Sequence, residues 1–160
     1  MNVEQKDWGI AGEAQAVQRT LTIRMSDNMR FTPAHLEVKQ GETVRLIVNN
    51  SGKLLHELVI GSPQALAEHA EQMLKFPTME HGSPDMAHVA ARKTGEIVWH
   101  FNRAGDFAFA CLIPGHYQAG MTGTIRVSAP SGDMTDGEVR FRAEQIKGAF
   151  VVMSIEKITP

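Results

Sequence analysis

The chain has 160 residues, 42% of them hydrophobic, which is enough for one packed domain plus an appendage but too few for two ordinary domains. Its 16 basic and 18 acidic residues are interspersed and leave a formal net charge of −2, which argues against nucleic acid or an anionic lipid surface as the main partner. No stretch of about 18 apolar residues occurs, so no membrane insertion is expected.

The first half of the chain indicates a series of short strands. Residues 1–18 show no sustained period and are expected to form a poorly ordered lead-in or an edge strand. They lack the apolar core of a signal peptide, so an exported protein would appear here in its mature form behind an added methionine. Alternating or β-branched stretches then predict strands at 21–25, 29–31, 35–38 and 43–48. Strands this short, separated by turns, favour a sandwich or a barrel.

A helix is predicted to interrupt the strands. It follows a strand at 56–60, with Ser62 as its N-cap and Pro63 in its first turn, and it ends before Pro77. Its apolar residues at helical spacing are Leu66, Ala70, Met73 and Leu74. We expect this helix to lie in a long crossover between two sheets. Residues 77–94 contain two prolines and a glycine without a clear period and are predicted to form a long loop.

The second half returns to strands and ends in an appendage. Strands are predicted at 95–101, 107–111 and 123–127, and in the second of these Phe107, Phe109 and Cys111 share one face. Linker composition follows, and two alternating stretches hinged at 147–148 predict a C-terminal hairpin. The sequence therefore predicts an all-β Greek-key sandwich over 19–129, preceded by the lead-in and followed by a linker and β-hairpin over 130–160.

The residues that carry chemistry lie in one loop. The single cysteine of the chain excludes an intramolecular disulfide, and Cys111, His116 and Met121 follow one another at intervals of five residues between two predicted strands. One thiolate, two imidazoles and a weak axial thioether suit both Cu(I) and Cu(II). The second imidazole must come from elsewhere, and His56, at the start of a strand, is the natural candidate. We therefore predict one copper ion per chain, held by His56, Cys111, His116 and Met121.

Three alternatives exist for this loop. In the first alternative, Cys111 and Met121 are ordinary core residues and His116 is a surface turn residue, but this requires three coincidences in one loop. A zinc site is a poor fit because only one thiolate is present and a methionine is included. A Cys-His nucleophile pair lacks a recognisable base-orienting or oxyanion-stabilising motif.

Residues 20–127 resemble the cupredoxins, or blue copper proteins, which carry Cys, His and Met on the loop between the last two strands and a His upstream. The segments 25–33, 56–59 and 111–121 look more closely like exported bacterial plastocyanin/azurin-like proteins found beside copper-tolerance functions. That resemblance implies a β-sandwich, a type 1 copper site and a periplasmic location. Many blue copper proteins have Asn immediately after the upstream His, where it supports the thiolate loop, whereas this chain has Glu57.

The appendage carries a second likeness. Residues 133–139 resemble the start, and 139–158 the last hairpin, of the small OB-fold periplasmic copper/silver chaperones. The metal-binding middle of that family is missing here, so the hairpin is expected to pack without a site of its own.

Further methionines and histidines are secondary candidates. A Cu(I) acquisition patch of thioethers and imidazoles would comprise Met73, Met79, His81, Met86 and His88, with core or loop packing as the alternative. Core packing is the better expectation for Met25 and Met29. His35 and His100 lie in predicted strands and are expected to be structural or surface groups, and His69 is expected to face solvent.

Such a site is compatible with three functions. A copper-handling protein would lower copper toxicity in the periplasm by sequestration, by oxidation-state buffering or by transfer to a partner protein, and the Met/His-rich loop favours it. An electron carrier would pass one electron between redox partners through His116. A copper enzyme would need further ions bound by His-x-His pairs, and none occurs in the chain, so no enzymatic activity is expected.

Overall fold

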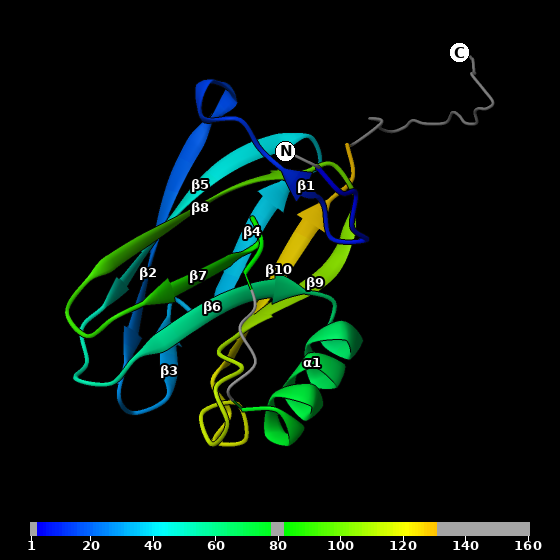
Figure 1. The fold of residues 1–160 in the computed structure, drawn as a ribbon. Coiled ribbons are helices and arrows are strands. Elements are labelled where there is room, and N and C mark those ends of the chain that lie inside the picture. The colour runs from blue at the N-terminus through cyan, green and yellow to red at the C-terminus, as the bar shows by residue number, and fades with distance from the viewer. Residues whose placement is uncertain (1–2, 78–81, 131–160) are drawn as a thin grey trace, which may run out of the picture. The chain divides into compact units, whose positions relative to one another are not determined.

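The computed structural model describes residues 3–77 and 82–130, which form two facing β-sheets with one α-helix beside them (Figure 1). In spatial order, the first sheet contains β1 (Ile10–Ala11), β8 (Thr94–Phe101), β5 (Glu42–Asn50), β2 (Arg19–Ser26) and β3 (Arg30–Thr32). The second contains β4 (His35–Lys39), β10 (Thr122–Ser128), β9 (Gly105–Ala110), β6 (His56–Gly61) and β7 (Met86–Val89). The all-β sandwich predicted from the sequence is therefore confirmed. The predicted C-terminal hairpin, Met79 and His81 lie outside the described residues.

Alternation of apolar and polar residues produces the sandwich. In β4 and β10 every second side chain is buried, so each strand turns one apolar face to the interior and one polar face to solvent. The largest side chains of the interior include Trp99, Phe101 and Phe109, all nearly or fully buried. Phe109 meets Phe31 of the other sheet edge-to-face, with ring centroids 4.9 Å apart. Burying a side chain of this size stabilises a fold by about 1.5–3 kcal/mol.

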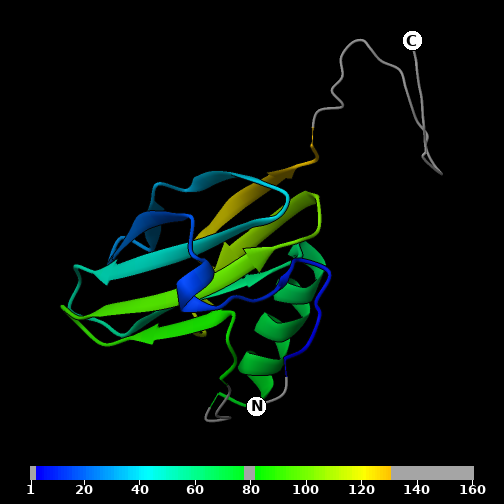
Figure 2. The same cartoon turned by 90° about the horizontal axis from the view of Figure 1, so that it is seen from above.

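The helix α1 (Pro63–Lys75) covers the outer face of the second sheet, where it packs on β6 and β9 (Figures 1 and 2). The predicted cap is present, since Ser62 Oγ accepts a hydrogen bond from the backbone N–H of Ala65 at 3.0 Å. Leu66, Ala70 and Met73 are buried as expected. Leu74, predicted to share this face, is instead 52% exposed because its position lies beyond the edge of the contact stripe.

The position of α1 differs from the expected crossover between sheets. It connects β6 to β7, and these strands are antiparallel neighbours within one sheet. Since the sandwich interior lies on one side of β6 and α1 on the other, all six residues of this strand are buried. This double burial places both His56 and Glu57 away from solvent.

Two segments without a clear sequence period have defined structure. Residues 77–94 are not a continuous loop, because Met86–Val89 forms β7 through backbone pairing with β6. In the lead-in, Ile10–Ala11 forms an edge strand on β8, followed by a 3-10 helix at Ala14–Ala16. Within the described residues, no helix has the length and apolar character needed to cross a membrane.

Candidate metal centre

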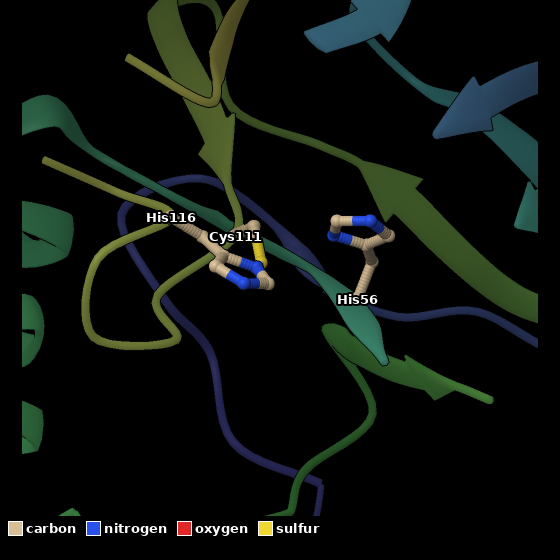
Figure 3. Close-up of side chains that lie close together, drawn as sticks. All are labelled: His56, Cys111 and His116. Atoms are coloured by element: carbon tan, nitrogen blue, oxygen red, sulfur yellow. The ribbon is translucent and has the colours of Figure 1, made fainter. Parts of the chain in front are cut away.

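Sheet pairing brings the candidate ligands together from distant parts of the sequence. His56 is the first residue of β6, and Cys111 directly follows β9. These strands are antiparallel neighbours, with Val59 opposite Ala110, so the start of β6 lies beside the end of β9. His116 belongs to the loop that follows β9. Figure 3 shows the three side chains close together, on β6 and on this loop.

The distances in this group suit a single metal ion. One donor atom from each of His56, Cys111 and His116 lies within 4.8 Å of the others. The Sγ atom of Cys111 is 3.6 Å from Nδ1 of His116, and the two imidazole ring centroids are 4.9 Å apart. His56 and Cys111 are buried, whereas His116 is half-buried. The group therefore has an inner part shielded from water and one imidazole at the surface.

Met121 lies at the other end of the same loop and is fully buried in the interior. The loop closes on itself: the backbone N–H of Cys111 donates to the carbonyl of Met121 at 3.1 Å, and that of Met121 donates to the carbonyl of His116 at 3.3 Å. Gly115 and Gly120 have φ angles of 90° and 94°, a region in which glycine is favoured over residues with a Cβ. These bonds and turns hold all three loop candidates near the end of β9.

Asp27 orients His56, and the sequence analysis assigned it no role. It sits in the turn between β2 and β3, where its Oδ1 lies 2.9 Å from Nε2 of His56 and its Oδ2 accepts from the backbone N–H of Lys53 at 2.7 Å. The hydrogen bond from Lys53, and then that from His56, lower the pKa of Asp27. Since a carboxylate only accepts hydrogen bonds, Nε2 carries the proton and Nδ1 presents a lone pair.

The second ring nitrogen of His56, Nδ1, has the surroundings expected of a metal ligand. Its Nδ1 atom is buried and has no hydrogen-bond partner among the described residues. A buried polar atom without a partner costs about 1–3 kcal/mol, so its retention calls for a ligand. The arrangement of a carboxylate on one ring nitrogen and a metal on the other is common in metal sites.

Burial keeps the two candidate ligands Cys111 and His116 uncharged in the metal-free protein. Burial raises the pKa of the Cys111 thiol to about 11, although hydrogen bonds from the backbone N–H groups of Glu57 and Ile113 act in the opposite direction. Burial is the main cause that lowers the pKa of His116, and the proximity of the His56 ring acts in the same direction. Near neutral pH the centre therefore holds a neutral thiol and a neutral His116 imidazole. A soft thiolate with two imidazoles is a donor set suited to copper.

The remaining methionines and histidines named as candidates lie in several different parts of the fold. Met25 is fully buried in the main core, and Met29 packs against that core. Met73 is buried on the sheet-facing side of α1, and Met86 packs against the same cluster. His35 pairs with Glu37, and His100 lies 3.0 Å from the hydroxyl of Thr43. His69 is half-buried instead of fully exposed. Copper binding by Met73, Met86 and His88 stays a prediction.

Comparison with known proteins also points to copper binding. Residues 17–128 match the family model of copper-binding proteins of the plastocyanin/azurin family. The chain is 49% identical over 120 residues to the "copper-resistant cuproprotein CopI" of Rubrivivax gelatinosus, covering 75% of this chain and 73% of that protein. It is 38% identical over 149 residues to the protein of the same name from Pseudomonas aeruginosa PAO1, covering 75% and 82%.

Solved structures show the same fold. The auracyanin of Roseiflexus castenholzii superposes with a TM-score of 0.60 at 20% identity, covering 70% of this chain and 98% of that one. Auracyanin B gives a TM-score of 0.60 at 22% identity, covering 75% and 94%.

Proposed function

Because the chain belongs to the plastocyanin/azurin family of copper-binding proteins, we propose that it acts in copper tolerance by binding one copper ion per chain in the periplasm. The copper-resistance role is supported by the two CopI relatives, which are 49% and 38% identical. The periplasmic location is our inference from the resemblance to exported copper-binding proteins.

We assign the copper ligands to Nδ1 of His56, Sγ of Cys111, Nδ1 of His116 and the thioether of Met121. The observation that carries this assignment is the convergence of three donor atoms within 4.8 Å, one of which is a buried nitrogen without a hydrogen-bond partner among the described residues. Bound copper would supply a one-electron Cu(I)/Cu(II) couple. Asp27 fixes the tautomer of His56, and the sandwich interior shields Cys111 from water.

A second candidate function is electron transfer. It is favoured by the half-buried position of His116, which offers a path from the buried Cys111 to the protein surface. A physiological redox partner would then dock over this imidazole. Either role is non-enzymatic, and the sequence contains no His-x-His pair that would bind the additional coppers of a copper oxidase.

The first experiment is a titration of the apoprotein with Cu(II), followed by visible absorption and electron paramagnetic resonance. We expect an intense thiolate-to-copper band that saturates at one equivalent in the unaltered protein and is absent in Cys111→Ser. A full-intensity band in Cys111→Ser would refute the ligand assignment.

Physiological role is tested separately, in a strain lacking the gene. Growth in excess copper should be restored by the unaltered gene and not by Cys111→Ser. If the unaltered gene does not restore tolerance although the protein binds copper, the electron-transfer role is favoured.

A further inference from the structure

We propose that Glu57 is a positioning residue of the copper centre, whose buried carboxylate fixes the chain next to Cys111 and places a negative charge beside the metal that favours Cu(II) over Cu(I). This inference rests on the proposed copper site. It goes further in assigning a role to the position at which the sequence departs from the Asn of many blue copper proteins.

The first contact of Glu57 is with the loop that carries the thiol. Its Oε2 atom accepts a hydrogen bond from the backbone N–H of Leu112 at 3.1 Å. Leu112 directly follows Cys111 and is itself fully buried. Glu57 in turn directly follows His56, so one carboxylate ties together the two segments that contribute the inner candidate ligands.

The second contact fixes the other oxygen. Oε1 of Glu57 lies 3.1 Å from Nε2 of His88, which stands opposite Glu57 in the pairing of β6 with β7. Glu57 is only 2% exposed, whereas the side chain of His88 is 38% exposed. The carboxylate is thus held from both sides, with His88 between it and solvent.

Hydrogen bonding to Leu112 explains why an acceptor lies at position 57, but not why this acceptor is a charged carboxylate. An amide at this position would also accept from Leu112, and it would avoid the cost of desolvating a carboxylate. A buried charge acts strongly on a neighbouring ion because little water screens it. Such a charge stabilises the more positive oxidation state of a metal held there.

The test uses Glu57→Gln, which keeps the size and the acceptor for Leu112 but removes the charge. The matched control is Glu96→Gln in β8, where the carboxylate is half-exposed and pairs with Arg45 at the surface. In the copper-loaded proteins we expect Glu57→Gln to favour Cu(I) about tenfold, an upward shift in reduction potential of about 59 mV for one electron. The Glu96→Gln potential should stay unchanged. Equal potentials in all three proteins would overturn the electrostatic role.

The positioning role is tested without copper, in the apoprotein. Glu57→Ala removes the acceptor of the Leu112 N–H, so hydrogen exchange at this amide should accelerate at least tenfold, while Glu57→Gln keeps it protected. Unchanged protection in Glu57→Ala would overturn the positioning role. Should the unaltered protein show no thiolate-to-copper band, the proposed function fails, and the exchange rates still decide whether Glu57 holds the loop.

Discussion

Asp27 shows how a single side chain prepares the centre for a metal. It fixes the proton of His56 on Nε2 and also accepts from the backbone N–H of Lys53, so it orients the ring and the segment leading to it at once. Cys111 is prepared differently, since its burial keeps the thiol protonated until a cation compensates the charge of the thiolate.

Asp27→Ala should weaken copper binding by about 10–100-fold, the usual effect of removing the partner of a metal-ligating histidine. The measurement is Cu(II) competition with a chelator of known affinity. Asp106→Ala serves as control, because Asp106 pairs only with Arg126 at the surface of the second sheet among the described residues. Unaltered affinity in Asp27→Ala would show that His56 needs no such support.

Copper binding should release about one proton per ion at pH 7.5. The Cys111 thiol, with a pKa of about 11, is protonated at this pH and must lose its proton to become a ligand, whereas His116 has a lowered pKa and is already neutral. Copper affinity should accordingly rise about tenfold per pH unit between pH 7 and 8. A pH indicator in weakly buffered solution measures the release, and Cys111→Ser should release none.

At the scale of the elements, α1 accounts for the burial of β6. The helix presents Leu66, Ala70 and Met73 to the outer face of the second sheet, where Val59, Ala110 and Leu112 are buried against it. The strand that carries His56 is thereby covered on both faces. Its burial on the outer face depends on a helix that itself contributes none of the proposed ligands.

Leu66→Ala should therefore lower the free energy of unfolding of the apoprotein by about 2–5 kcal/mol, because it leaves a cavity under α1. Leu74→Ala, on the exposed side of the same helix, should change it by less than about 0.5 kcal/mol. Chemical denaturation of the two variants measures the difference. Equal losses would mean that α1 does not stabilise the sheet through its buried face.

At the scale of the whole molecule, all four proposed copper ligands lie within the sandwich. All proposed ligands and both supporting carboxylates lie between Asp27 and Met121, and the family match ends at residue 128. A chain ending at residue 130 should consequently bind one copper ion with an unchanged absorption spectrum. Loss of the thiolate-to-copper band in this shortened protein would show that residues 131–160 take part in the site.

The sequence alone determined the strand pattern, the cap of α1 and the candidate ligand loop, because these depend on alternation and spacing between near neighbours. The interval of five residues from Cys111 to His116 and again to Met121 is visible without any structure, and so is the resemblance to cupredoxins, which the family match confirms.

Tertiary structure decided the contacts between distant segments. The bond from Asp27 to His56 spans 29 positions and that from Glu57 to Leu112 spans 55. No local pattern points to Asp27, and the resemblance to cupredoxins drew attention to position 57 without showing its bond to Leu112. Likewise, β7 has too few residues to show a period, and only its pairing with β6 defines it as a strand. Spacing thus identified the candidate copper ligands, whereas sheet pairing decided which side chains orient them and shield them from water.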